Sequence, residues 1–143
     1  MGFDGASMRI AGVLETCVYA SDLEAARGFY QGLLGLELFA EQPGRHLFFR
    51  AGPGVFLVFN PQATQQETAL PPHGAQGSVH VCFRVAAEEL QGWAERLEAH
   101  GYPVTWAEWK AGPSLYVRDP AGNLVELAPA AIWGLPDGHL KPQ

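Results

Sequence analysis

Lysine is scarce in this chain, and positive charge is scarce with it. Lys110 and Lys141 are its lysines, and nine basic residues stand against fifteen acidic ones, which gives a formal net charge of −6. The sequence contains no run of basic residues. A protein of this charge has no general electrostatic attraction to phosphate backbones or anionic lipid surfaces. We therefore expect neither nucleic acid nor a membrane as a partner.

Long apolar runs and closely spaced cysteines are also missing. No stretch approaches the roughly 18 apolar residues of a transmembrane helix, and residues 1–12 lack the apolar core of a secretory signal. Cys17 and Cys82 lie far apart, which is no disulfide framework, so we expect a cytoplasmic protein. The 143 residues, 48% of them hydrophobic, suffice for one domain or two small halves.

Two stretches of the chain, residues 12–60 and residues 78–129, repeat one order of elements. In each, an apolar strand leads to an amphipathic helix and then to three short strands separated by Gly or Pro turns. Ser21, as N-cap, and Glu24 form a capping box before the first helix, which ends at Gly35. The expected strands are 10–20, 36–41, 45–51, 55–60, 78–85, 104–110, 113–118 and 123–128, and the expected helices are 22–34 and 88–100.

Three segments lie outside these two modules. Residues 1–11 are Gly-rich, and we expect a flexible N-terminus. Residues 61–77 are rich in Pro, Gln, Gly, Thr and Ala and show no periodicity, which predicts a linker or a lid loop. Residues 130–143 form a C-terminal tail that contains Trp133.

One carboxylate stands out in the last strand. Asp119-Pro-Ala-Gly-Asn123 is a turn sequence, and Leu-Val-Glu-Leu-Ala follows it as a short, largely buried strand. Glu126 lies in the middle of that strand. An ionised Glu on a covered face is costly unless it is paired or coordinates a metal ion. Glu126 is therefore a candidate ligand, although pairing with Arg118 or Arg84 would also explain it.

The two modules align as weak copies of each other. Glu15–Tyr19 aligns with His80–Arg84, and Gly54–Val58 aligns with Gly122–Glu126. Two fused copies of one unit can bring equivalent strands together around a pseudo-two-fold axis. This arrangement favours a cavity shared between the modules.

The pattern resembles the vicinal oxygen chelate superfamily, which includes glyoxalase I, fosfomycin-resistance enzymes, extradiol dioxygenases, methylmalonyl-CoA epimerase and bleomycin-binding proteins. The resemblance covers about residues 12–129. It implies an α+β fold in which two βαβββ modules form a curved eight-stranded mixed sheet, a half-open barrel with helices outside, and it implies a homodimer. The residues that carry it are Asp22-Leu23, Phe29-Tyr30, Leu34-Gly35-Leu36, Asp119-Pro120-Ala121-Gly122-Asn123 and Glu126.

The resemblance also implies a set of metal ligands. The family's ligand positions fall on Glu15, His80 and Glu126, although the family more often has His or Gln at the first of these. A fourth, optional position falls on Val58, which cannot ligate. Three protein ligands leave positions open for a substrate. One imidazole and two carboxylates suit a divalent Mn, Fe, Ni, Co or Zn ion.

The implied function is a metal-dependent small-molecule enzyme whose ion chelates vicinal oxygens of the substrate, of the isomerase, lyase or dioxygenase type. Glu15 is the candidate catalytic base if the reaction is a proton transfer. An extradiol dioxygenase is disfavoured because it expects two His and one carboxylate. The alternative function is a metal-free, bleomycin-resistance-like protein that binds a ligand in an aromatic-lined cavity.

Alternation along the strands predicts the residues that contact the substrate. In the first module one strand face carries His46, Phe48 and Arg50, and the matching face of the second carries Ser114, Tyr116 and Arg118. Arginine there suits a carboxylate or phosphate, although Arg118 could instead brace the turn at Asp119. Cys17 and Cys82 share faces with Glu15 and His80 and are expected to be small fillers. The aromatic candidates are Trp106 or Trp109, which fall on opposite faces, and Trp133; the prediction chooses Trp106 and Trp133.

Overall fold

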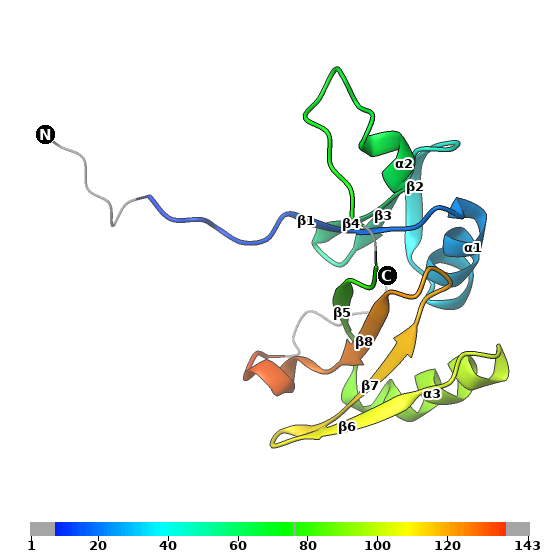
Figure 1. Cartoon of the computed structure of the whole chain (residues 1–143). Coiled ribbons are helices and arrows are strands. Elements are labelled where there is room, and N and C mark those ends of the chain that lie inside the picture. Colours follow the sequence, from blue (N-terminus) through cyan, green and yellow to red (C-terminus); the bar gives the residue numbers. More distant parts are fainter. Residues whose placement is uncertain (1–7, 76, 137–143) are drawn as a thin grey trace, which may run out of the picture.

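The computed structural model describes residues 8–75 and 77–136, which form two βαβββ modules joined by a long connection (Figure 1). Both modules have the predicted order of elements. The first module comprises β1 (Glu15–Tyr19), α1 (Leu23–Arg27), η2 (Gly28–Leu33), β2 (Glu37–Gln42), β3 (His46–Ala51) and β4 (Gly54–Phe59). The second comprises β5 (His80–Arg84), η3 (Ala87–Glu89), α3 (Leu90–Ala99), β6 (Thr105–Trp109), β7 (Gly112–Arg118) and β8 (Leu124–Ala128), and the short helices α2 (Pro61–Thr64) and η4 (Ala130–Trp133) follow the two modules.

Each module makes one four-stranded mixed sheet. The strand orders are β1-β4-β3-β2 and β5-β8-β7-β6, and in both sheets the first strand of the module pairs in parallel with its last strand. The α+β class with two repeated modules is therefore confirmed, and the eight strands form two open sheets. Among the described helices, none is long and apolar enough to cross a membrane.

Three local predictions change in the structure. Strand β1 begins at Glu15 rather than at Ile10, because its partner β4 begins at Gly54 and offers almost no backbone to the residues before Glu15. The N-cap of α1 is Asp22 rather than Ser21, since the Asp22 carboxylate accepts the Ala25 N–H at 3.0 Å. The connection 61–77 contains the helix α2, which has Pro in its first turn.

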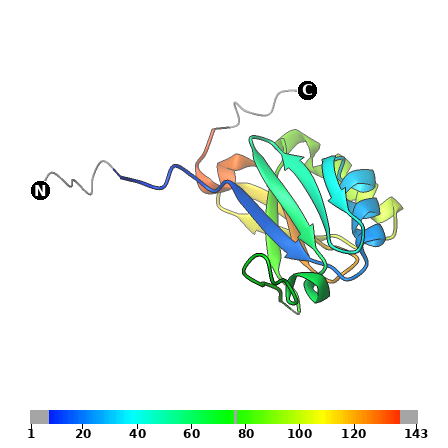
Figure 2. The same cartoon turned by 90° about the horizontal axis from the view of Figure 1, so that it is seen from above.

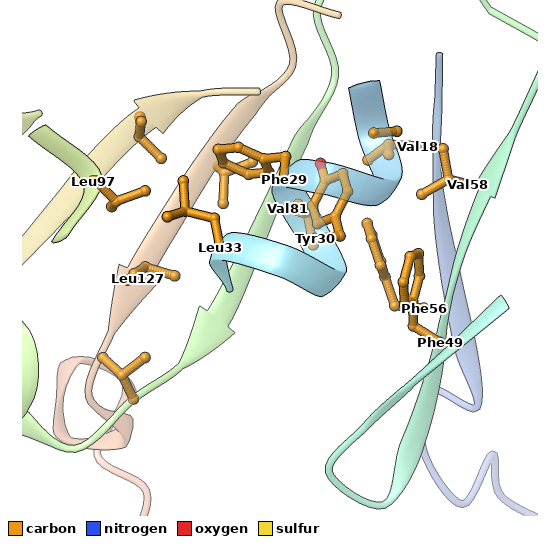
Figure 3. Close-up of a cluster of buried hydrophobic side chains, with 14 of the residues drawn as sticks. Val18, Phe29, Tyr30, Leu33, Phe49, Phe56, Val58, Val81, Leu97 and Leu127 are labelled. Atoms are coloured by element: carbon orange, nitrogen blue, oxygen red, sulfur yellow. The ribbon is translucent and has the colours of Figure 1, made fainter. Parts of the chain in front are cut away.

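A single hydrophobic core joins the modules. Figure 3 shows Phe29, Tyr30 and Leu33 of η2 between residues of the two sheets. Phe29 and Tyr30 are 1% and 0% exposed, and the Tyr30 ring lies 4.8 Å from the Phe56 ring. Each sheet therefore turns one face to this shared core. The opposite face of each sheet points outward, and these outward faces carry the candidate site residues.

The turn before β8 ties the modules together through Asp119, which is 4% exposed. Its Oδ1 accepts the backbone N–H groups of Ala121 and Asn123 at 2.9 and 2.8 Å. Its Oδ2 accepts the Tyr30 hydroxyl at 2.7 Å and the Asn123 amide at 2.9 Å. That amide also donates to the Tyr19 carbonyl at 3.0 Å. The turn sequence thus does more than reverse the chain, because it fastens β8 to α1–η2 and β1.

Asp119→Ala is expected to lower the free energy of unfolding by about 3 kcal/mol or more, since it leaves four donors, three of them in buried hydrogen bonds, without their acceptor. Tyr30→Phe, which removes one of these hydrogen bonds, is expected to cost about 1–2 kcal/mol. Urea unfolding of both variants measures the two losses. A cost for Asp119→Ala no larger than that for Tyr30→Phe would contradict the role given to this turn.

Candidate functional site

The candidate site centres on a histidine and a glutamate on neighbouring strands of the second sheet. His80 begins β5 and Glu126 lies in the middle of β8, and the two strands run parallel. The His80 Nε2 atom lies 3.4 Å from Glu126 Oε1. The His80 Nδ1 atom lies 2.9 Å from the carbonyl oxygen of Leu124. Because a carbonyl can only accept, Nδ1 carries a proton, and Nε2 is the ring nitrogen that faces Glu126.

The other oxygen of Glu126 is held by a buried hydrogen bond. Glu126 is 7% exposed, and its Oε2 accepts the hydroxyl of Ser114 at 2.7 Å. Ser114 is 0% exposed and accepts the Trp109 indole N–H at 2.9 Å. The carboxylate therefore has one oxygen fixed in the sheet and one facing His80.

Cys82 and Tyr116 flank Glu126 on the neighbouring strands. Cys82 pairs with Glu126 across β5 and β8, and Tyr116 pairs with it across β7 and β8. Partial burial and then the charge of Glu126 raise the pKa of Cys82 to about 12. Loss of solvent and the same charge raise the pKa of Tyr116 above its ordinary value. Both groups are neutral at pH 7.

The His80–Glu126 pair fits a divalent metal ion. A lone pair on Nε2 and a carboxylate oxygen attract each other only through a proton or a cation between them. Ligand distances of about 2.0–2.2 Å put two ligand atoms about 3.0–3.4 Å apart, close to the observed separation. The Nδ1–H to carbonyl bond of His80 is the usual support of a metal-binding imidazole.

Glu15 does not join this pair within one chain. It begins β1, is exposed, and lies on the outward face of the first sheet. Within residues 8–75 and 77–136, no group of three or more His, Cys, Asp and Glu side chains could hold a metal ion. The structure thus unites two of the three predicted ligands and leaves the third on the other module.

The register corrects the fourth ligand position. Glu15 pairs with Val55 and His80 with Leu124, so the residue matching Glu126 in the first module is Leu57 rather than Val58. Val58 is 0% exposed and faces the shared core. The alignment by sequence was one residue out, which moves a side chain to the opposite face of a strand. Leu57 cannot ligate either, so the ligand set does not change.

Part of the connection, residues 61–75, packs on the outward face of the first sheet. The Tyr19 hydroxyl lies 2.7 Å from His73 Nδ1, and the His73 ring packs edge-on against Phe59 at 4.7 Å. Arg45 anchors the same segment by an ion pair with Glu67 at 2.8 Å. The sequence alone assigns no role to His73, because its contact with Tyr19 spans more than fifty residues and no local pattern predicts that contact.

The predicted substrate-contacting residues fall into two groups. His46 and Phe48 stack at 3.9 Å on the outward face of the first sheet, where burial and then Arg45 lower the pKa of His46. On the outward face of the second sheet, the Tyr116 ring lies 6.0 Å from that of His80. These three residues are thus placed to line one site if the two faces meet.

The remaining candidates are engaged elsewhere or lie apart. Arg50 lies over the Phe39 ring at 4.3 Å, and Arg118 donates to Ser78 and to the Gly122 carbonyl. Arg118 therefore braces the turn, although not through Asp119. Trp133, in η4, is 78% exposed.

The two tryptophans of β6 lie on opposite faces, and the one predicted to contact the substrate, Trp106, lies on the core face. Trp106 pairs with Leu115, which is 0% exposed and belongs to the core face of the sheet. Trp109 instead reaches Ser114 and lies on the face of Glu126. The register of β6 against β7 determines which tryptophan lies on which face, and the sequence of β6 alone does not give that register.

Two clefts lie away from the His80–Glu126 pair. One, of about 480 Å³, opens between the modules and is bordered by Glu15, Cys82 and Arg84 among mainly apolar residues. The other, of about 610 Å³, lies at the start of α1. Neither is lined by His80 or Glu126, so the pair sits on an open sheet face rather than in a closed pocket of one chain.

The fold thus consists of two repeated βαβββ modules with a His–Glu pair on the outward face of the second sheet. The chain belongs to the Glyoxalase/Bleomycin resistance protein/Dioxygenase superfamily, whose family model matches residues 12–127. This confirms the resemblance to the vicinal oxygen chelate group.

Solved structures agree with this assignment. A structure described as lactoylglutathione lyase from Agrobacterium tumefaciens is 39% identical, covers 90% of this chain and 100% of its own, and superposes with a TM-score of 0.85. A glyoxalase/bleomycin resistance protein/dioxygenase from Nocardioides, 22% identical, covers 95% of this chain and 91% of its own with a TM-score of 0.67. A glyoxalase-related enzyme from Fulvimarina pelagi, 24% identical, covers 82% and 87% with a TM-score of 0.66. The last two show the fold alone.

Proposed function

We propose that this protein is a metal-dependent enzyme of the glyoxalase type, acting on a small molecule with two neighbouring oxygen atoms. Its site would hold one divalent ion on His80 and Glu126 of one copy of the chain and on Glu15 of a second copy. The single observation that carries the proposal is the 3.4 Å approach of His80 Nε2 to Glu126 Oε1, with the far atom of each side chain already hydrogen-bonded.

A second copy is proposed because each chain leaves both halves of the site open. Glu15 and the His80–Glu126 pair lie on outward faces of different sheets, and the shared core prevents those faces from closing on each other. The segment before β1 extends away from the body in both views (Figures 1 and 2) and exposes Ile10, Val13 and Leu14 at 92%, 86% and 78%. Apolar exposure of this extent favours a contact with another chain.

The chemistry divides among the three ligands. The bound ion would supply Lewis acidity, which polarises substrate oxygens and stabilises developing negative charge on them. Glu126 is unsuited to leave its position, because Ser114 and the sheet hold it. Within the described residues Glu15 forms no ion pair, so its carboxylate is the one free to accept a proton from the substrate.

The substrate would lie between the two outward faces. His46, Phe48 and Tyr116 offer aromatic surface there, and Arg50, Arg118 and Trp133 are the other candidate contacts. The relative described as lactoylglutathione lyase favours a lyase or isomerase reaction over a dioxygenase reaction here. A carboxylate in the first ligand position also disfavours the dioxygenase, which expects two histidines.

Elemental analysis of untagged protein, purified without added metal, tests the proposal. The expected result is close to one Mn, Fe, Ni, Co or Zn ion per chain, together with a lower melting temperature after chelation that the same ion restores. Ligand that binds only the folded state raises stability in this way. Protein that contains no metal and does not change its melting temperature with any of these ions would contradict the proposal, and would favour a metal-free ligand-binding protein.

A further inference from the structure

A continuous line of hydrogen bonds runs from an exposed tryptophan to the candidate ligand. Trp109 Nε1 lies 2.9 Å from Ser114 Oγ, and Ser114 Oγ lies 2.7 Å from Glu126 Oε2. Trp109 ends β6 and Ser114 lies near the start of β7, so the bond crosses a tight hairpin. The line connects three residues whose exposures are 46%, 0% and 7%.

The chemistry of these groups fixes the direction of both bonds. An indole N–H can only donate, so Ser114 accepts from Trp109. The serine hydroxyl then has its own proton free, and it donates that proton to Glu126. A carboxylate that accepts such a bond is held in one orientation. The oxygen left over is Oε1, the one that faces His80.

We propose that Ser114 and Trp109 are positioning residues of the site. They orient the Glu126 carboxylate toward the metal ion, and they couple that orientation to a substrate group that packs on the exposed indole. This rests on the proposed function. Ser114 acts through Glu126 and does not touch the ion. Trp109, held by its N–H, presents its ring as a fixed apolar wall on the same sheet face, suited to a planar or aromatic part of a substrate.

The first part of the test uses metal-free protein. Two-dimensional ¹H–¹⁵N NMR resolves the four indole N–H groups, and Trp109→Phe assigns the one that belongs to Trp109. Ser114→Ala is expected to shift the Trp109 signal and speed its exchange with solvent. The signal of Trp106, on the opposite face of β6, is expected to stay in place. An unchanged Trp109 signal would show that the hydrogen-bonded line does not exist and would overturn the proposal.

The second part measures affinity by calorimetric titration of metal-free protein with Mn²⁺, Co²⁺ and Zn²⁺. Ser114→Ala is expected to weaken binding about 10–100-fold, as the loss of an outer support of a metal ligand typically does. Trp109→Phe is expected to weaken it by a smaller factor, and Trp106→Phe, the same chemical change on the other face, by less than 2-fold. The Co²⁺ absorption spectrum is expected to change in Ser114→Ala and to stay constant in Trp106→Phe.

The outcomes distinguish failure of the positioning role from failure of the proposed metal site. Parent protein that binds metal while Ser114→Ala binds it equally well, with an unaltered Co²⁺ spectrum and melting temperature, overturns the positioning role and leaves the metal site intact. Parent protein that binds none of the three ions overturns the metal site, and with it the role of Ser114 toward an ion. If Ser114→Ala does not fold, Trp109→Phe alone decides, since it removes the indole N–H and keeps an aromatic side chain at this position.

Discussion

His80→Ala and Glu126→Ala each reduce the affinity for divalent metal by more than about 100-fold, because each removes a direct ligand, whereas loss of an outer support costs about 10–100-fold. The two variants are expected to lose affinity to a similar extent, since each leaves only two of the three proposed protein ligands. Calorimetric titration of metal-free protein measures the losses, and elemental analysis of the purified variants gives an independent reading.

Two further substitutions serve as matched controls for this experiment. His100→Ala removes a histidine whose Nδ1 contacts a carbonyl at the end of α3, and Glu108→Ala removes an exposed carboxylate on β6. Both are expected to bind metal like the parent. Retention of parent affinity in either His80→Ala or Glu126→Ala would show that the ion, if bound, sits elsewhere on the protein.

A dimer that combines two variants, each of which binds little metal alone, is expected to regain metal binding if the site is shared between chains. Glu15→Ala keeps His80 and Glu126, and His80→Ala keeps Glu15. A mixed dimer therefore contains one complete site and one that lacks both groups, so it is expected to bind about half the metal of the parent dimer, as two-fold symmetry requires. Each variant alone is expected to bind little metal.

The experiment needs mixed dimers of known composition. Co-expression with two different affinity tags, followed by two purification steps and tag removal, isolates them from the parental forms. A mixed dimer that binds no more metal than its parents would place all ligands in one chain or exclude Glu15 from the site. A protein that stays monomeric at micromolar concentration in sedimentation analysis would contradict the shared site before any mixing.

The sequence predicts the fold well because its signals are local and repeated. Capping residues, positive-φ glycines such as Gly35 and Gly101, and alternating apolar residues give the order of strands and helices in both modules. Boundaries are less accurate where tertiary contacts decide them. Residues 10–14 have strand-like composition, yet they form no strand because no neighbouring strand extends beside them.

The site is predicted in part, for the same physical reason. His80 lies on the first strand and Glu126 on the last strand of the second module, where the resemblance places ligands, and the structure brings the two side chains together. Identifying the fourth ligand position depends on the register of β1 against β4. Placing Trp109 on the face of Glu126 depends on the pairing of β6 with β7. Such facts depend on how strands align across the sheet, and a one-residue shift reverses the face of every side chain. The support of Glu126 by Ser114 depends on the same pairing.

Diffraction from crystals grown with the bound ion, measured at the absorption edge of that metal, tests the central claim most directly. The account predicts one anomalous peak per chain, in bonding contact with His80 Nε2 and Glu126 Oε1 of one copy and with the Glu15 carboxylate of a second copy. An ion that lies away from the His80–Glu126 pair, or crystals in which the pair remains a direct contact without metal at saturating concentration, would contradict it.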